Sequence, residues 1–265
     1  MEKNRMDLLN THAQNYIRAV MANLLRREGF VSRGEKDLHW YRVVNGSVLQ
    51  VVYFYTHWKA LPIFMSIAYG CHPLFIPPEY PSGIHMGSML RSFEVMNPGR
   101  VIGKKGENIS NSIFAPDACV SCPDDSYRGC DILTSILEKL NAIQTIEQCY
   151  TEHKHRYIHV AELLKLPPDE TFCRISVDFM DEVAYMADEE LYPYCISRIN
   201  GELERYAKAQ ETRNLWKIEK YELSALTHLR TAIIDQRRKE YLTYLQERQS
   251  QSIRQLKRKV KDIII

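Results

Sequence analysis

The chain has 265 residues, of which 45% are hydrophobic and 26% are charged, and its formal net charge is +2 at pH 7. A chain of this length and composition is typical of a globular protein with one large core or two small ones. The small net charge provides no overall electrostatic field that favours nucleic acid. No apolar run approaches the roughly 18 residues that a membrane span needs. Seven cysteines in so long a chain exclude a small disulfide-stabilised scaffold, and the charged segment Met1–Arg5 has no secretory apolar core, so we expect a cytoplasmic protein with reduced thiols.

An amphipathic helix is expected near the N-terminus. Its apolar residues recur at three- and four-residue steps: Leu9, Ala13, Tyr16, Ile17, Val20, Met21, Leu24 and Leu25. Gly29 stands just past Arg26 and Arg27, where a helix end is predicted, because glycine readily adopts the left-handed conformation that closes many helices.

A β-hairpin follows, because Asn-Gly at 45–46 stands between the β-rich runs Leu38–Val44 and Ser47–Thr56. Both residues of this pair tolerate the positive φ of a type I′ turn. Further strands are predicted over Ile63–Tyr69 and Ile84–Val95. The four runs predict an antiparallel sheet that is often apolar on both faces, so other elements should cover each side.

Helices dominate the rest of the chain. Asn97–Gly129 is rich in glycine, proline and polar residues and is predicted as a long loop, after which Asp131 opens a helix. No strand pattern occurs after about His159, and further helices are expected over 189–210 and 214–261.

Together these elements predict an α+β fold. An antiparallel sheet of about four strands with flanking helices forms a domain over residues 1–155, and an all-helical region, 156–265, ends in a long basic amphipathic helix. The order helix, four strands, helix, with Gly29-Phe30 after the first helix, resembles a bacterial domain family of unknown function. The hairpin aromatics that add to this resemblance are Trp40, Tyr41, Tyr53, Phe54 and Tyr55. The resemblance covers residues 8–155 and implies a bacterial α+β domain, but no activity.

The string Val-Ile-Gly-Lys-Lys-Gly-Glu-Asn-Ile at 101–109 resembles the core of a KH domain. In that fold a Gly-x-x-Gly loop holds the backbone of about four nucleotides. The matching residues here are Gly103, Lys104, Lys105 and Gly106. The glycines would let the chain approach phosphates closely, and the lysines would add charge. Between Val95 and Val101 there is no room for the helix that precedes the loop in a KH fold, so a coincidental match on a surface turn is favoured over nucleic-acid contact.

Cysteine and histidine clusters are candidate metal ligands. The candidate thiols are Cys119, Cys122 and Cys130, and the candidate imidazoles are His153, His155 and His159. A Cys-x-x-Cys pair can bind a tetrahedral metal, but a second pair is missing, and two basic residues among the histidines would repel a cation. We therefore predict no metal and no cofactor, with incidental thiols and a solvated histidine-rich helix end as the expected structure.

An acidic patch follows. Its members are Asp178, Asp181, Glu182, Asp188, Glu189 and Glu190. Paired carboxylates can perform acid–base chemistry or hold magnesium. At these helical spacings they are expected to form the solvated face opposite Phe179 and Val183, or to pair with the basic tail.

The basic character of the chain is confined to its tail. Residues 228–265 contain ten Lys or Arg against four Asp or Glu, a local charge of +6, so the remainder carries −4. Basic residues that could contact nucleic acid are Arg237, Arg238, Lys257 and Arg258. An apolar seam with coiled-coil spacing is formed by Ile253, Leu256, Val260 and Ile263. This seam predicts a helix–helix contact, within the chain or in a homo-oligomer.

These observations favour a binding or interaction protein that assembles with a protein partner or a second copy through its C-terminal helices. A nucleic-acid-binding protein that uses the Gly-Lys-Lys-Gly loop and the basic tail is the first alternative. A metal-dependent enzyme is the second. The chain contains no Gly-x-Ser-x-Gly string, no Walker loop and no dinucleotide fingerprint, so catalysis has no motif to support it.

Overall fold

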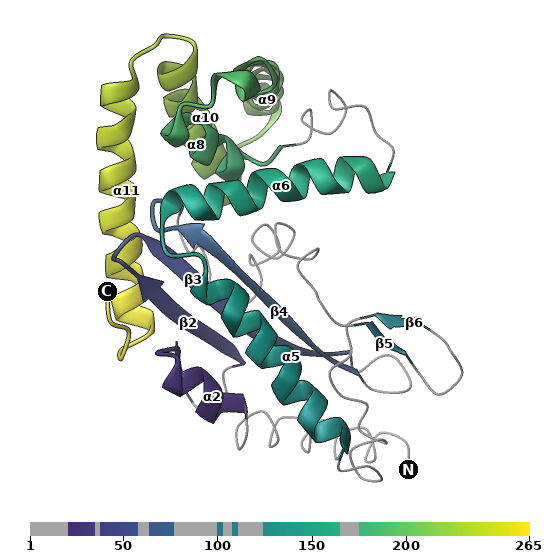
Figure 1. The fold of residues 1–265 in the computed structure, drawn as a ribbon. Coiled ribbons are helices and arrows are strands. Elements are labelled where there is room, and N and C mark those ends of the chain that lie inside the picture. Colours follow the sequence, from purple (N-terminus) through teal and green to yellow (C-terminus); the bar gives the residue numbers. More distant parts are fainter. Residues whose placement is uncertain are drawn as a thin grey trace. The chain divides into compact units, whose positions relative to one another are not determined.

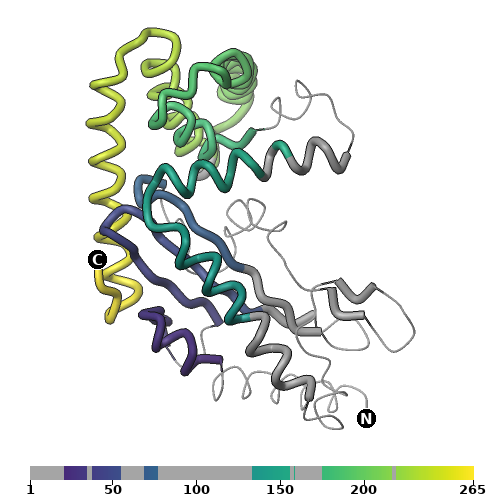
Figure 2. The backbone as a smooth tube through the Cα atoms, in the orientation of Figure 1, coloured from purple at the N-terminus to yellow at the C-terminus, as the bar shows by residue number. Residues whose placement is uncertain are grey.

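A computed structural model of the chain describes residues 21–34, 38–57, 64–76, 100–102, 108–110, 124–164 and 175–265. They fall into two compact units. The described parts of the first unit lie within Met1–His72, Pro78–Gln144 and Arg254–Ile265, and those of the second within Pro73–Pro77 and Thr145–Ile253. Figure 1 shows the elements of both units as a ribbon, and Figure 2 traces the same backbone with the end of the chain in yellow.

The first unit contains the predicted four-stranded antiparallel sheet, in the order β1-β2-β3-β4 (Figure 1). Its strands are β1 (Val31–Ser32), β2 (His39–Val44), β3 (Val48–His57) and β4 (Phe64–Pro73). The strand count agrees with the prediction, but one of the two edge strands is β1, which precedes the hairpin and was not predicted. The strand predicted over 84–95 lies outside the described residues.

The β2–β3 hairpin turns at Asn45 and Gly46, whose φ angles are 49° and 62°. Two successive positive φ angles are those of a type I′ turn, so this prediction is confirmed. The Ser47 amide donates to the Val44 carbonyl at 3.1 Å and closes the turn.

Helix α2 (Ala22–Arg27) is closed by Gly29, two residues after its last residue, whose φ is 79°. The Phe30 amide donates to the Leu25 carbonyl at 2.9 Å, and the Gly29 amide donates to the Arg26 carbonyl at 3.0 Å. This pair of bonds is a Schellman motif, in which the residue after the glycine returns to contact the helix. Phe30 and Leu25 both belong to the core, so the predicted helix end is confirmed and also directs a large aromatic ring inward.

The core of the first unit lies between α2, one face of the sheet and α5 (Asp124–Asn141). It consists of Met21, Ala22, Leu25, Phe30, Trp40, Val52, Phe54, Tyr69, Leu133, Ile136, Leu137 and Leu140. The opposite face of the hairpin is also buried, at Tyr41, Leu49 and Val51, as expected for a sheet covered on both sides. Helix α5 begins earlier than the predicted Asp131.

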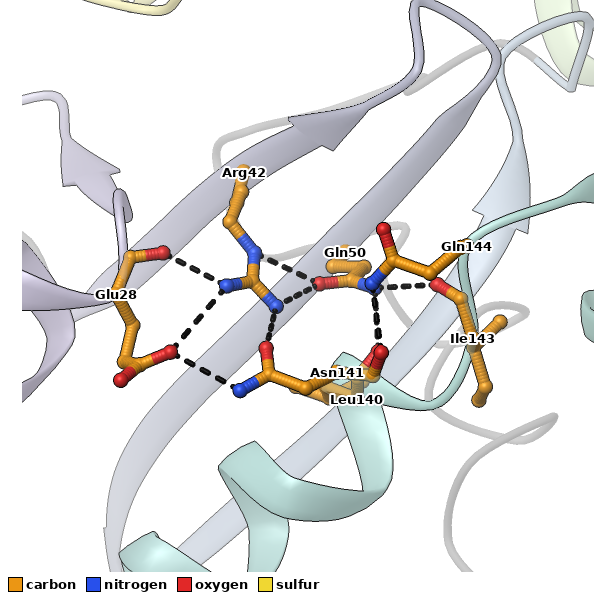
Figure 3. Close-up of polar contacts among 7 residues, drawn as sticks. All are labelled: Glu28, Arg42, Gln50, Leu140, Asn141, Ile143 and Gln144. Atoms are coloured by element: carbon orange, nitrogen blue, oxygen red, sulfur yellow. Dashed lines mark hydrogen bonds and ion pairs between the residues drawn. The ribbon is translucent and has the colours of Figure 1, made fainter.

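Two polar side chains join the sheet to α2 and α5 (Figure 3). Arg42 on β2 and Gln50 on β3 are direct cross-strand partners, and the Arg42 Nε donates to the Gln50 Oε1 at 2.9 Å. Arg42 also donates to the Glu28 carbonyl at the end of α2, at 2.7 Å. Gln50 is fully buried and donates to the carbonyls of Leu140 and Ile143, at 2.7 and 2.8 Å. Carbonyls at a helix end lack the usual donor one turn further on, so Arg42 and Gln50 supply donors from the sheet; the Leu140 carbonyl also accepts from the Ile143 amide at 3.0 Å.

The main segment of the second unit, Thr145–Ile253, is all-helical, as predicted for the C-terminal region. It contains α6 (Ile146–Leu164), α8 (Val177–Met186), the short 3₁₀ helix η2 (Glu189–Leu191), α9 (Tyr192–Thr212), α10 (Lys217–Ile233) and the first part of α11 (Arg238–Lys259). The Ser176 hydroxyl accepts from the Phe179 amide at 3.2 Å and caps the start of α8. No helix in the described part of the chain is long and apolar enough to cross a membrane.

Candidate functional site

The end of α11 presents a face of exposed basic side chains in the first unit. Its members are Arg254, Lys257, Arg258 and Lys261, called here the basic face. Residues three and four apart lie on the same side of a helix, so the first three project together, and Lys261 follows just after the helix ends at Lys259. Among the described residues, none of the four forms an ion pair.

The predicted apolar seam lies on the other side of the same segment. Leu256, Val260 and Ile263 are buried within the single chain, whereas Ile253 is half-buried. A side chain that is already buried in one chain is not offered to a second chain. Within Arg254–Lys259, the exposed side chains are those of Arg254, Lys257 and Arg258.

No carboxylate in the described part of the chain forms an ion pair with the basic face. Like charges three or four residues apart on a helix repel by a few tenths of a kcal/mol per pair. The negative end of the helix dipole favours cations in the last turn, which accounts for Lys257 and Arg258. It does not account for Arg254, which lies before that turn, or for Lys261, which lies after the helix. An anion held against all four would relieve this repulsion.

The two other predicted basic residues are already partnered. Arg237 forms ion pairs with Asp235, at 3.6 Å, and with Glu240, at 3.1 Å. Arg238 donates to the backbone carbonyl of Tyr185 at 2.8 Å. Of the four tail residues singled out in the sequence, Lys257 and Arg258 are therefore the ones whose charge remains uncompensated within the described chain.

The Gly-Lys-Lys-Gly string at 103–106 lies outside the described residues. Its flanks are β5 (Arg100–Ile102) and β6 (Asn108–Ser110), which pair antiparallel with Val101 opposite Ile109. In a KH domain the Gly-x-x-Gly loop leads into a helix, whereas the next described element here is the strand β6.

The candidate metal ligands predicted from the sequence lie in different parts of the chain, and several of their side chains are not described. Cys119 and Cys122 lie outside the described residues, and Cys130 lies in α5, where its side chain is not described. His155 is exposed, as expected for a solvated helix face, and the side chain of His159 is not described.

His153, by contrast, is buried and belongs to a polar cluster in the second unit. Its Nδ1 lies 2.9 Å from both carboxylate oxygens of Glu182 on α8, and its Nε2 lies 3.9 Å from the Sγ of Cys149. All three side chains are buried, and Cys149 is one turn before His153 on α6. Sequence reasoning missed this cluster. The signal that could have found it is the four-residue spacing of the cysteine and histidine, which places both on one helix face.

The prediction that the acidic patch forms a solvated face is wrong for Asp181 and Glu182, which are 0% and 2% exposed. Glu189 and Glu190 are exposed, as predicted. The Asp181 carboxylate forms an ion pair with the buried guanidinium of Arg248 at 2.6 Å. Arg248 belongs to the basic tail, so this pair is the alternative that the sequence predicted.

A second acidic residue of the patch, Asp188, also has a cationic partner. Lys154 Nζ lies 2.5 Å from its carboxylate, and the Tyr150 hydroxyl donates to the same oxygen. Burial would raise the pKa of Asp188, but the hydrogen bonds from Lys154 and Tyr150 outweigh it and lower that pKa. Burial, and then the bond to Asp188, raises the pKa of the Tyr150 hydroxyl. Burial also raises the pKa of the nearby Cys195 thiol to about 12, so Cys195 is a protonated, structural thiol.

No family model, curated protein or solved structure matches the chain.

Proposed function

We propose that this protein is a binding protein for nucleic acid, and that the basic face of α11 holds the phosphate backbone. The observation that carries the proposal is a set of four exposed cations that form no ion pair among the described residues: Arg254, Lys257, Arg258 and Lys261. Lys and Arg side chains that neutralise phosphates release counterions, and this release provides most of the affinity of sequence-independent binding.

The composition of the segment supports contact with the backbone rather than with bases. Residues 254–265 contain no aromatic side chain on which a base could stack. Phosphate contacts position a protein on nucleic acid but carry no sequence information. We therefore expect binding with little dependence on sequence and a steep dependence on salt.

The experiment measures fluorescence anisotropy of labelled single-stranded RNA and duplex DNA of mixed sequence with the full chain. Neutralising four phosphates predicts a slope of log K against log salt of about −3 to −4 on duplex DNA. Replacing Lys257, Arg258 and Lys261 by Gln should remove most of this slope and weaken binding on every sequence equally.

The matched control is the double substitution of Arg205 and Lys208 by Gln. Both residues are exposed on α9, and each already forms an ion pair with a glutamate of the same helix. The control should bind almost as the wild type does. Absence of binding to both probes at low salt would end the proposal, and an equal loss in both variants would show that the basic face has no special role.

A second candidate is assembly with another copy of the chain through the C-terminal helices, favoured by the exposed indole of Trp216. This side chain is 69% exposed at the start of α10, and the Arg213 guanidinium lies 5.0 Å from its ring centroid. Pre-ordered tryptophans are frequent anchors of protein interfaces. Light scattering should then give a mass above the 31.0 kDa of one chain. The mass should fall to that of the monomer in Trp216→Ala. It should not fall in the control Ile158→Ala, which changes another exposed side chain. A monomeric mass at every concentration would exclude this candidate.

A further inference from the structure

The buried cluster of Cys149, His153 and Glu182 is not used by the proposed function, and its chemistry is distinct. A thiol, an imidazole and a carboxylate come together from two helices, α6 and α8, within the second unit. Each side chain is at least nine-tenths buried. Polar groups are costly to bury, so a cluster of this composition needs either mutual compensation or a ligand that compensates it.

The hydrogen bonds fix the orientation of the imidazole. Both oxygens of Glu182 lie 2.9 Å from His153 Nδ1, so this nitrogen carries a proton and donates it to the carboxylate. The lone pair of the neutral ring is then on Nε2, the nitrogen that faces the Cys149 sulfur. A carboxylate on the far nitrogen of a histidine is the usual outer support of a metal-bound imidazole.

The distance between the two donor atoms suits one shared metal ion. Zinc binds thiolate sulfur at about 2.3 Å and imidazole nitrogen at about 2.0–2.1 Å, and at a tetrahedral angle these lengths place sulfur and nitrogen about 3.6 Å apart. The observed separation of Cys149 Sγ and His153 Nε2 is 3.9 Å. A small rotation of either side chain closes the difference.

We propose that Cys149 and His153 are two ligands of a buried structural Zn²⁺ site, with Glu182 as the carboxylate that orients the histidine. Thiolate and imidazole donors select zinc over magnesium or calcium, which prefer oxygen. The charges also balance, because a dication compensates the Cys149 thiolate and the Glu182 carboxylate, while the histidine stays neutral. Further ligands from elsewhere in the chain, or water, complete the tetrahedral shell.

The competing arrangement places a proton, rather than a metal, between sulfur and nitrogen. A thiol donating to Nε2 would satisfy the same geometry with no ion bound. The two arrangements differ in metal content, in the spectrum of a cobalt-substituted chain and in the response of stability to a chelator.

The first test measures zinc in the full chain, purified without chelator, by plasma mass spectrometry. We expect one zinc per chain, and a thiolate-to-cobalt charge-transfer band when Co²⁺ replaces it. Cys149→Ser should abolish this band, and His153→Gln should reduce the zinc content. Glu182→Gln keeps an acceptor for the imidazole N–H, so it should retain the metal with an affinity about 10- to 100-fold lower.

The matched control is Cys195→Ser, which removes another buried thiol of the same unit and should leave zinc content unchanged. Serine substitution of the remaining five cysteines then identifies any further thiolate ligand. Should Cys149→Ser fail to fold, X-ray absorption at the zinc edge of the wild-type chain provides an independent readout and should show both sulfur and nitrogen neighbours. A folded chain that holds no zinc and gives no cobalt band would overturn the proposal, as would a zinc spectrum without sulfur. Neither result depends on nucleic-acid binding.

Discussion

The carboxylate of Asp181 and the guanidinium of Arg248 form an ion pair of 2.6 Å that is almost closed to solvent, with side chains 0% and 5% exposed. Asp181 lies on α8 and Arg248 on α11. The Tyr241 hydroxyl donates to the second carboxylate oxygen at 2.5 Å, and Arg248 donates to the Tyr221 hydroxyl. Because both charges are removed from water, each needs the other as a counter-charge to offset its lost hydration.

Replacing Arg248 alone should therefore be strongly destabilising. Arg248→Met leaves the Asp181 carboxylate buried without a counter-charge, and we expect the free energy of unfolding to fall by about 3–5 kcal/mol. The double variant Asp181→Leu, Arg248→Met removes both charges and should recover most of this loss. Urea denaturation measures all three proteins. Arg237→Met, an exposed control, should change stability by less than about 0.5 kcal/mol, and a similarly small loss in Arg248→Met would contradict the prediction.

A substitution at Gly29 should lower the free energy of unfolding through backbone strain and not through a steric clash. Its φ of 79° is unfavourable for other residues, whereas an added Cβ would meet the Arg42 side chain at an ordinary 3.7 Å. Gly29→Ala should therefore lower stability by about 1–2 kcal/mol, the cost of the left-handed conformation. At Gly34 φ is not positive and a Cβ would meet nothing within 4 Å, so Gly34→Ala should be nearly neutral or slightly stabilising. Equal urea midpoints for the two variants would refute the argument.

The parts of the fold that were predictable from the sequence are those set by neighbouring residues. The turn at Asn45 and Gly46 and the helix end at Gly29 each depend on residues that tolerate positive φ, and a single sequence shows these directly. The early start of α5 at Asp124 was missed because its first residues are polar, without the apolar periodicity that marks the rest of the helix.

The buried polar clusters could not be predicted, because their partners are distant in sequence. Asp181 and Glu182 are adjacent and both look like solvated carboxylates beside Phe179 and Val183. Their burial depends on Arg248 and on His153, which are 67 and 29 residues away from them. Helical periodicity gives the direction in which a side chain points, but it does not identify the helix that will cover it.

Gln50 should be essential for docking the end of α5 on the sheet. Gln50→Met preserves the side-chain length but removes the donor to the Leu140 and Ile143 carbonyls. The Leu140 carbonyl keeps the Ile143 amide as a donor, so the variant affects mainly the Ile143 carbonyl. Since a buried carbonyl left without a donor costs about 1–3 kcal/mol, we expect a loss of about 1–3 kcal/mol in urea denaturation. Lys139→Met, on an exposed position of the same helix, is the control and should be nearly neutral. Amide hydrogen exchange in α5 should accelerate in the first variant and not in the second.

The Glu219 carboxylate should contribute to the loss of folding stability of the second unit as pH falls. It accepts two hydrogen bonds from the Arg213 guanidinium, at 2.6 and 2.7 Å, and one from the Trp216 amide at 2.8 Å. The Arg213 bonds, and then the Trp216 amide, lower the pKa of Glu219 from 4.5 to about 2. A carboxylate whose pKa is depressed in the folded state stabilises that state above its unfolded pKa, and this contribution is lost as pH falls towards the folded value.

The loss should therefore occur between the two pKa values, 4.5 and about 2. Glu219→Gln still accepts the Trp216 amide but cannot ionise, so its stability should fall less steeply with acid over this range than that of the wild type. The measurement is the urea midpoint of α-helical circular dichroism as a function of pH. Glu211→Gln changes an exposed carboxylate on α9 that forms no ion pair among the described residues, and its pH profile should follow the wild type. Parallel profiles for wild type and Glu219→Gln would mean that the pairing with Arg213 does not contribute to the acid sensitivity.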